Sequence, residues 1–209
     1  MTQERFDNAA ATWDDKPKRR EVAAAIAAAI KREVSLSRHA KALEVGCGTG
    51  LVTCELAGLL KKVVAIDTSQ GMLAILQEKI TAHGLGNVEA LAFDLSAGGK
   101  LASSDFDLIY SAMTLHHIKD TASFLAACRS HLKPGGILAL ADLDEEDGSF
   151  HDDMTGVEHC GFGHKKLADL VTSSGFGDVR FVTAHRISKE QDDGRRREYP
   201  VFLMIARAL

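Results

Sequence analysis

The segment Ala42–Gly50 (ALEVGCGTG) constrains the fold more than any other part of the chain. A short apolar run leads into three glycines at alternate positions, Gly46, Gly48 and Gly50. Residues Leu51–Leu60 then show helical periodicity. A strand that passes through a glycine-rich turn into a helix is typical of nucleotide-binding sites. Glycines let the backbone turn tightly and let a ligand approach it, and the helix start presents free N–H groups.

Beyond this segment, apolar runs typical of strands alternate with patterns typical of helices. The alternation predicts an α/β fold in three layers (α-β-α), with helices on both faces of a mostly parallel sheet. The predicted strands span residues 42–45, 63–66, 88–93, 106–111, 136–141, 178–184 and 199–206, and the predicted helices span residues 51–60, 70–83, 121–132 and 165–174. Only a polar loop, residues 187–198, separates the last two strands, so we expect them to pair as an antiparallel hairpin.

Two further segments interrupt the alternation. Residues 18–34 form an alanine-rich amphipathic pattern, and we expect residues 1–40 to be a helical segment packed on a core domain, residues 41–209, within one domain overall. Trp13 and Lys16 precede this helix. Two roles are open for them: a position near the functional site, or a contact that only anchors the segment. Residues 142–163 form a polar stretch too long for an ordinary loop, which predicts a functional lid.

Composition narrows the class of protein. The chain has 209 residues, of which 45% are hydrophobic, and a formal net charge of −4. This charge argues against a general nucleic-acid binder, and the basic run Arg195–Arg197 fits a solvated loop. No apolar run approaches the roughly 20 residues that span a bilayer, and the polar start does not resemble a secretory signal. The cysteines form no paired or metal-like motif, which predicts the reducing cytoplasm.

The glycine spacing distinguishes two kinds of nucleotide site. The glycines follow G-x-G-x-G, whereas a dinucleotide site has G-x-G-x-x-G, and Leu51 stands where that third glycine is expected. With an acidic residue ahead of the glycines, the segment resembles the first motif of the class I S-adenosylmethionine-dependent methyltransferases. The resemblance covers roughly residues 41–209 and implies a seven-stranded sheet with the last strand antiparallel. It also implies S-adenosylmethionine as the cofactor, S-adenosylhomocysteine as the product, and cofactor contacts from Glu44, Gly46, Gly48 and Gly50.

An acidic residue, Asp67, follows the second predicted strand. An ionised carboxylate at this place has acceptors for both hydroxyls of a ribose, and ribose binding is our interpretation. Capping of the helix that begins near Ser69 is the alternative role. Thr68 and Met72 come next, and we expect them on the adenine side of the cofactor.

The resemblance implies further cofactor residues after the third and fourth strands. In similar families an acid at the place of Asp94 accepts a hydrogen bond from the adenine amino group, and the amide of the next residue, Leu95, contacts the ring. A turn-forming role is the alternative for Asp94. Ser111 and Ala112 end the fourth strand, where ligands of open α/β sheets lie, so we expect them beside the sulfonium. His116 follows in an x-x-L-H-H pattern that is frequent in small-molecule methyltransferases, and we expect it near the cofactor.

The implied reaction is in-line transfer of a methyl group from a sulfonium. Alignment of donor and acceptor supplies about 7–11 kcal/mol in such reactions, so a catalytic residue is not required. If a base is used, the candidates are His116, His151 and His159, because histidine titrates near neutrality. The lid residues also fit a metal site or a solvated loop, but we favour contact with the substrate and predict no metal.

Other functions stay open at this point. A cofactor-binding protein without catalysis would keep the same glycines and acids. A nicotinamide-dependent oxidoreductase is opposed by Leu51 and by the lack of a Tyr-x-x-x-Lys pair after the fifth strand. The chain has neither the Pro-Pro-aromatic motif nor the Pro-Cys pair of enzymes that methylate DNA bases. We therefore predict a small-molecule acceptor and no nucleic-acid or membrane partner. The sequence predicts neither the identity of the acceptor nor the oligomeric state.

Overall fold

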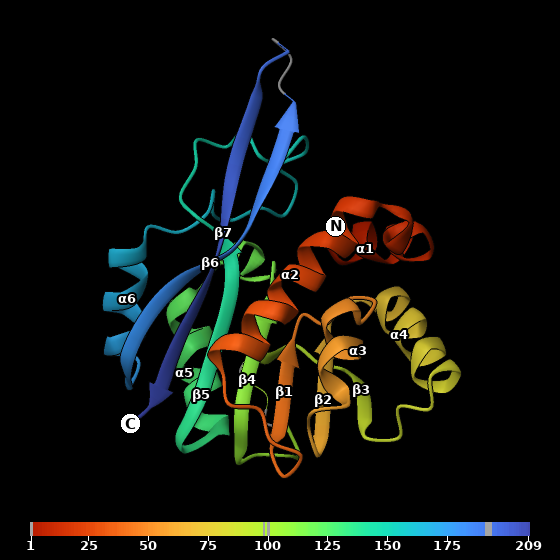
Figure 1. Cartoon of the computed structure of the whole chain (residues 1–209), viewed down its shortest axis with the longest axis vertical. Coiled ribbons are helices and arrows are strands. Elements are labelled where there is room, and N and C mark those ends of the chain that lie inside the picture. The colour runs from red at the N-terminus through yellow and green to blue at the C-terminus, as the bar shows by residue number, and fades with distance from the viewer. Residues whose placement is uncertain (1, 98, 100, 191–193) are drawn as a thin grey trace.

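The computed structural model describes residues 2–97, 99, 101–190 and 194–209. A seven-stranded sheet runs through the molecule in the order β3-β2-β1-β4-β5-β7-β6 (Figure 1). The strands are β1 (Lys41–Val45), β2 (Lys62–Asp67), β3 (Val88–Ala92), β4 (Phe106–Ala112), β5 (Leu132–Leu143), β6 (Phe176–Glu190) and β7 (Arg196–Ala208). Strands β1 to β5 pair in parallel, and β7 pairs antiparallel with both β5 and β6. The predicted sheet with its reversed last strand is confirmed.

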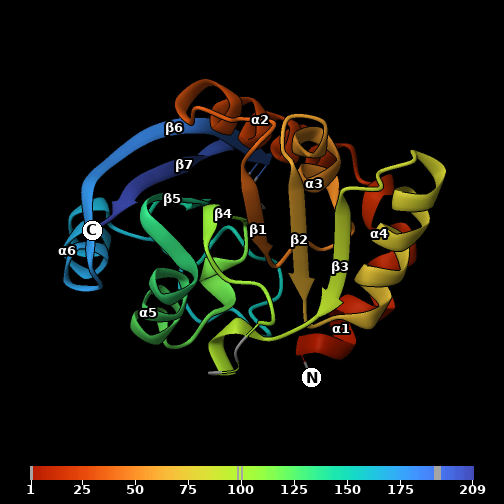
Figure 2. The ribbon, with the colours of Figure 1, turned by 90° about the horizontal axis from the view of Figure 1, so that it is seen from below.

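Helices cover both faces of this sheet, which confirms the three layers (Figure 2). One face carries α2 (Pro17–Glu33), α3 (Leu51–Ala57) and α4 (Gln70–Ala82), and the other carries α5 (Thr121–His131) and α6 (His164–Ser173). The remaining helical elements are α1 (Thr2–Ala9) and three 3-10 helices, η1 (Ala10–Asp15), η2 (Leu95–Ala97) and η3 (Leu115–His117). None of the described helices is both long and apolar enough to cross a membrane.

The strands divide their apolar side chains between two cores, because successive side chains of a strand point to opposite faces. In β1, Ala42 packs in the core beneath α2 and α3, whereas Leu43 and Val45 pack in the core beneath α5. Both β1 and β2 are buried over almost their whole length, as expected for parallel strands covered on both faces. The central place of β1 puts the glycine turn at the middle of the carboxyl edge of the sheet.

The N-terminal segment packs on this framework as a helical cap. Pro17 begins α2, where proline is favoured because its missing N–H has no partner in a first turn. Val22, Ile26 and Ile30 are buried on the side of α2 that faces the sheet. The preceding elements, α1 and η1, contact α4. The helix predicted over residues 18–34 therefore forms within one residue of its expected bounds.

The terminal hairpin is longer than the sequence pattern predicts. Both strands continue into the predicted loop 187–198, so the predicted extent of that loop is wrong; residues 191–193 lie outside the described part. Ile187 pairs with Tyr199 across the hairpin, and both are buried. Charged residues alternate with them, so this part of the strands contains no continuous apolar run from which it could be predicted. Two residues of the basic run Arg195–Arg197 accordingly belong to β7 and not to a solvated loop.

Strand β5 also exceeds its predicted bounds of 136–141. It begins at Leu132, which pairs with Phe106 before the register shifts, and it ends at Leu143. The polar stretch that was expected to begin at residue 142 therefore begins at Asp144. We call residues 144–163 the lid and residues 2–16 the cap.

Candidate functional site

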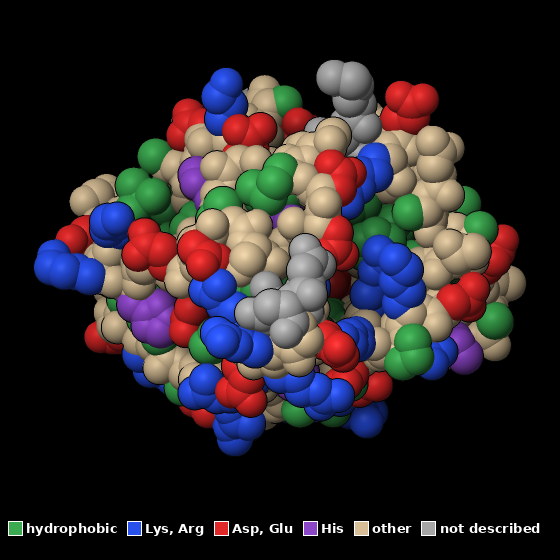
Figure 3. Space-filling view, turned by 90° about the horizontal axis from the view of Figure 1, so that it is seen from above, with side chains coloured by type: hydrophobic (Ala, Val, Ile, Leu, Met, Phe, Trp, Pro, Cys, Tyr) green, Lys and Arg blue, Asp and Glu red, His purple; other side chains and the backbone are tan. Residues whose placement is uncertain are grey.

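A cavity of about 1270 Å³ opens at the carboxyl ends of β1, β2 and β4. The turns that follow these strands, the segment after β3, the cap, the start of α2 and the lid form its wall. Figure 3 looks onto this end of the molecule, where Lys and Arg side chains are interspersed with Asp and Glu. The parallel strands thus deliver their carboxyl-terminal residues to one cavity, as in other open α/β sheets.

The glycine turn has left-handed backbone at each of its three glycines, a conformation that other residues rarely adopt. A Cβ on Gly46 would lie 2.4 Å from Thr114, and a Cβ on Gly50 would lie 2.3 Å from Leu76. A Cβ on Gly48 would meet nothing within 4 Å, and Gly48 lines the cavity. Gly46 and Gly50 therefore permit close packing of neighbouring side chains, whereas Gly48 leaves space for a ligand against the backbone.

Asp67 ends β2 beside this turn. Its Oδ2 accepts a hydrogen bond from the N–H of Gly48 at 2.8 Å, and its Oδ1 accepts one from the N–H of Ser69 at 2.9 Å. Ser69 itself caps α4 by accepting from the N–H of Met72 at 3.1 Å. Burial raises the pKa of Asp67 above its usual value. Each carboxylate oxygen keeps a further lone pair, so Asp67 orders the turn and still offers acceptors to the cavity.

Glu44 lies beneath the turn and is buried. Its Oε2 accepts hydrogen bonds from the hydroxyls of Thr53 and Tyr110, the latter at 2.9 Å. Burial raises the pKa of Glu44 to about 7. Glu44 also belongs to the cavity wall. A nearby cation favours the charged form of such a carboxyl, so this position suits a ligand that carries positive charge.

The segments after β2 and β3 bring four more predicted residues to the cavity, namely Thr68, Met72, Asp94 and Leu95. Oδ1 of Asp94 accepts from the N–H of Ser96 at 2.8 Å and from its hydroxyl at 2.6 Å. These bonds fulfil the turn-forming role and leave Oδ2 without a partner among the described residues. Asp94 can therefore form the turn and accept a ligand hydrogen bond at the same time.

The structure places three predicted residues outside the cavity wall. Ser111 is buried, and its hydroxyl donates to the carbonyl of Val45 at 2.7 Å. Its neighbour Ala112 lines the cavity, because adjacent side chains of a strand point to opposite faces. Gly50 lies behind the turn, against α4. His159 is held by a hydrogen bond between its Nε2 and the carbonyl of Ile118 at 3.0 Å, so it anchors the lid.

A histidine cluster joins the ends of β4 and β5 to the lid. The ring centroid of His116 lies 4.1 Å from that of His117 and 5.0 Å from that of His151. Asp142 is fully buried at the end of β5, and its Oδ1 lies 2.8 Å from Nδ1 of His116. Nδ1 of His117 donates to the carbonyl of Gly156 at 2.7 Å. Burial lowers the pKa of both His117 and His151 to about 4, so both rings are neutral at neutral pH.

Sequence analysis identified His116 and His151 in this cluster but not the role of Asp142. The available signal is that Asp142 directly follows an apolar strand, at the edge where ligands of parallel sheets lie. Across the described part of the chain, no three His, Cys, Asp or Glu side chains are grouped so as to hold a metal ion.

Asp7 joins the cap to α4. Its carboxylate accepts hydrogen bonds from the hydroxyl of Ser69 and from the N–H of Gly71 at 2.9 Å. A Cβ on Gly71 would lie 2.9 Å from the backbone of Asp7, so only glycine permits this approach. Trp13 and Lys16 then lie in the cavity wall, which is the first of the two roles considered for them.

A second acid of the cap, Asp14, contacts the glycine turn. Its carboxylate accepts from the hydroxyl of Thr49 at 2.7 Å and forms an ion pair with Lys79 of α4. Lys79 also donates to the carbonyl of Thr49 at 2.8 Å. Sequence analysis did not find this network, because it joins residues that lie 30 or more positions apart.

Two basic side chains connect the lid to its neighbours. Arg5 of the cap pairs with Asp153 at 3.4 Å. Lys189 of β6 pairs with Asp152 at 2.7 Å and donates to the carbonyl of Phe150 at 2.6 Å. The lid therefore lies between the cap and the terminal hairpin.

Known proteins are similar to this chain over the part that carries most of the site. A family model described as a methyltransferase domain matches residues 43–140, which contain the glycine turn, Asp67, Asp94 and His116. The chain is 32% identical over 152 residues to the trans-aconitate 2-methyltransferase of Deinococcus radiodurans, covering 72% of this chain and 52% of that protein. It is 30% identical over 138 residues to the ubiquinone biosynthesis O-methyltransferase of Cereibacter sphaeroides, covering 64% of this chain and 54% of that protein.

Residues 43–140 belong to the methyltransferase-domain family, and the chain as a whole is similar to class I S-adenosylmethionine-dependent methyltransferases. The solved complex of DhpI with SAH matches with a TM-score of 0.73 at 23% identity, covering 98% of this chain and 93% of that one, which shows the shared fold. The chain spans about half the length of the curated relatives that it matches. The family model ends at residue 140, so Asp142, the lid and the terminal hairpin lie beyond it.

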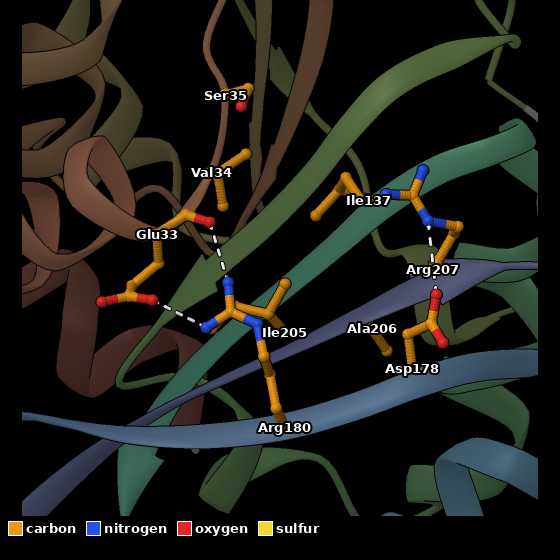
Figure 4. A pocket seen from close by; sticks show the side chains of 9 residues that line it. All are labelled: Glu33, Val34, Ser35, Ile137, Asp178, Arg180, Ile205, Ala206 and Arg207. Atoms are coloured by element: carbon orange, nitrogen blue, oxygen red, sulfur yellow. Dashed lines mark hydrogen bonds and ion pairs between the residues drawn. The ribbon is translucent and has the colours of Figure 1, made fainter.

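The chain also has a smaller cleft, of about 310 Å³, at the opposite end of the sheet (Figure 4). Arg180 of β6 pairs with Glu33 of α2 at 2.7 Å, and Arg207 of β7 lies 3.6 Å from Asp178. Both guanidinium groups thus already have acidic partners within the protein. The larger cavity, which holds the family's motif residues, is the candidate active site.

Proposed function

We propose that this chain binds S-adenosylmethionine and transfers its methyl group to a small-molecule acceptor. One observation carries the proposal: a single cavity brings together the open space above Gly48, the carboxylate of Asp67 and the segment that begins at Asp94. A sterically open turn after β1, with hydrogen-bond acceptors after the next two strands of the sheet, suits a nucleoside that lies against the backbone.

The residues present fit this cofactor. Asp67 keeps a lone pair on each oxygen for the ribose hydroxyls, and Asp94 keeps Oδ2 for the adenine amino group. Glu44, with a pKa of about 7, favours a cationic ligand above the turn. When bound, S-adenosylmethionine would supply a methyl group on positively charged sulfur, which is already activated toward nucleophiles.

The protein's contribution is then alignment and exclusion of water. The cap is held on the glycine turn through Asp14, and the lid is held between the cap and the hairpin through Arg5 and Lys189. These elements cover the cavity from the side opposite the strands. Holding two reactants in line in this way is worth about 7–11 kcal/mol, and removal of water strengthens the electrostatic interactions inside.

The volume of the cavity and the names of relatives support a small acceptor. At about 1270 Å³ the cavity exceeds the roughly 300–1,000 Å³ of a pocket for one ligand, so it has room for donor and acceptor together. The relatives named above act on trans-aconitate and in ubiquinone biosynthesis, judged from their names. Both names point to small organic molecules.

The direct test is formation of S-adenosylhomocysteine from S-adenosylmethionine in the presence of pooled carboxylic acids, phenols and alcohols. We expect acceptor-dependent turnover that is lost in Gly48→Val. Tight binding of S-adenosylhomocysteine with no turnover for any acceptor would instead favour the alternative of a cofactor-binding protein that does not catalyse. Saturable binding of NADH without binding of S-adenosylhomocysteine would favour an oxidoreductase.

A further inference from the structure

The carboxylate of Asp142 lies behind His116, which lines the cavity. It is fully buried, and two backbone N–H groups donate to it. The backbone N–H of His116 donates to Oδ2 at 3.1 Å, and the backbone N–H of Leu143 donates to Oδ1 at 2.7 Å. Nδ1 of His116 lies 2.8 Å from Oδ1. Each of its oxygens accepts one backbone hydrogen bond and keeps a further lone pair, so the carboxylate can also accept from the ring of His116.

This arrangement determines the tautomer of His116. Because Asp142 offers only acceptors, Nδ1 of His116 carries the proton, and Nε2 of the neutral ring is left as an acceptor. Nε2 has no hydrogen-bond partner among the described residues, and His116 lines the cavity. The backbone carbonyl of His116 accepts from the N–H groups of Glu158 and His159, so β5 and the lid hold the residue from both sides.

The surroundings distinguish His116 from the two neighbouring rings. The titratable groups that face it are His117 of η3, Asp142 of β5 and His151 of the lid. Both neighbouring histidines are partly buried and lack a carboxylate partner, and burial lowers the pKa of each to about 4. Nε2 of His151 is buried and has no hydrogen-bond partner in the described structure. Among the histidines of this cluster, and within the described residues, only His116 combines a buried carboxylate partner with a free ring nitrogen at the cavity.

We propose that His116, held by Asp142, is the general base that removes the proton from a hydroxyl group of the acceptor. The inference rests on the proposed methyl transfer. The hydroxyl proton moves to Nε2, and an electron pair of the oxygen forms the bond to the methyl carbon while the carbon–sulfur pair returns to sulfur. Asp142 stabilises the resulting imidazolium, which then releases its proton to solvent.

The proposal also specifies the chemical class of the acceptor. An alcohol or phenol is a poor nucleophile until it loses its proton, so it gains from a base. A carboxylate is already ionised at neutral pH, and a thiol ionises readily, so neither needs one. A built and buried His–Asp pair at the cavity therefore points to a hydroxyl acceptor.

Histidine NMR tests the pair without any acceptor. In ¹⁵N-histidine-labelled full chain near neutral pH, we expect the ring of His116 to be protonated at Nδ1 and not at Nε2. Asp142→Asn should shift the ring toward the Nε2-protonated form. The matched control is Asp144→Asn, which removes the partner of His164 at the same distance of 2.8 Å outside the cavity. Protonation of His116 at Nε2 in the wild type, or no response to Asp142→Asn, would overturn the proposal whether or not the protein transfers methyl groups.

Kinetics separate a base from a structural residue. With a phenol or alcohol acceptor, we expect His116→Gln to lower kcat by about 10²–10⁴-fold, and Asp142→Asn to lower it by up to about 10⁴-fold. KM and the affinity for S-adenosylhomocysteine should change less than about threefold, and transfer to a thiol acceptor should persist. Unaltered kcat with a hydroxyl acceptor in a folded His116→Gln protein, or turnover of carboxylates alone, would refute the role. A wild-type protein that does not bind S-adenosylhomocysteine would instead refute the proposed function.

Discussion

The cofactor side of the cavity and its acceptor side are held together by different forces. On the cofactor side, short turns follow directly on parallel strands and are ordered by backbone hydrogen bonds, such as that from the N–H of Gly48 to Asp67. On the acceptor side, the lid is joined to the cap and the hairpin through Arg5 and Lys189, and these ion pairs lie at the surface. Surface ion pairs contribute only about 0–1 kcal/mol each.

The difference parallels the range over which the family model matches. A turn with left-handed backbone at Gly46, Gly48 and Gly50 tolerates few other residues. Long polar segments joined by exposed charges can change composition at little cost in stability. The family model accordingly spans residues 43–140 and stops before the lid. The cofactor side therefore carries the match to the family model, whereas the lid lies outside it.

The largest expected effect comes from a substitution that disrupts only the cofactor side of the cavity. Gly48→Val places a branched side chain in the open space above the turn, at a φ of +54°. We expect at least an about 100-fold loss of S-adenosylhomocysteine affinity, equal to about 2.7 kcal/mol, with the lid unaltered. Calorimetric titration measures this. Gly58→Ala is the matched control, because Gly58 has open space and an ordinary φ of −66°. A folded Gly48→Val protein with unchanged affinity would contradict the assignment of the turn.

The stability contributions of the two sides should change with pH in opposite directions. The pKa of Glu44 is raised from 4.5 to about 7, so its contribution is fully present below about pH 4.5 and is lost as pH rises through 7, on the order of 3 kcal/mol. The pKa values of His117 and His151 are lowered from 6.5 to about 4, so their contribution is present above pH 6.5 and is lost as pH falls through 4.

Glu44→Gln should remove one of these two opposed contributions to stability. In the variant, the free energy of unfolding should rise more steeply between about pH 4 and pH 7 than in the wild type, because only the histidine contribution remains. Urea unfolding at a series of pH values measures the slope. Parallel curves for the two proteins would show that Glu44 does not hold a proton in the folded state.

A smaller effect is expected from Asp67→Asn, which keeps one acceptor oxygen and removes the charge. Loss of charge-assisted hydrogen bonds costs about 1.5–3 kcal/mol, so the affinity for S-adenosylhomocysteine should fall about 10–100-fold. The control is Asp120→Asn, since Asp120 caps α5 through the N–H of Ser123 outside the cavity. Equal effects of the two substitutions on affinity would rule out a direct contact from Asp67.

The smallest effect concerns the acceptor side. The double variant Arg5→Ala, Lys189→Ala removes both basic anchors of the lid and should lower global stability by no more than about 1–2 kcal/mol. Amide hydrogen exchange in residues 150–158 should quicken, while cofactor affinity changes less than about threefold. Lys165→Ala, which removes an exposed pair within α6, is the control. Unchanged exchange in the lid would show that other contacts hold it.

The parts that sequence analysis predicted correctly depend on residues adjacent in the chain. Alternating strands and helices gave the three layers, and the glycine spacing pointed to the family. The pairing of His116 with Asp142 was missed because these residues meet only when β4 and β5 align. Ser111 was expected at the ligand because a strand end alone does not say which of two neighbouring residues faces the cavity. The length of the terminal hairpin was missed because charged residues alternate with its buried ones.

The central claim, that the cavity above the glycine turn is a cofactor site for S-adenosylmethionine, is tested most directly by calorimetric titration. S-adenosylhomocysteine is the ligand, and NADH is run in parallel. We expect one site per chain with a dissociation constant on the order of micromolar, about −8 kcal/mol, and no heat of binding for NADH. Saturable binding of NADH with no binding of S-adenosylhomocysteine would contradict the account, because the glycine turn would then hold a different nucleotide.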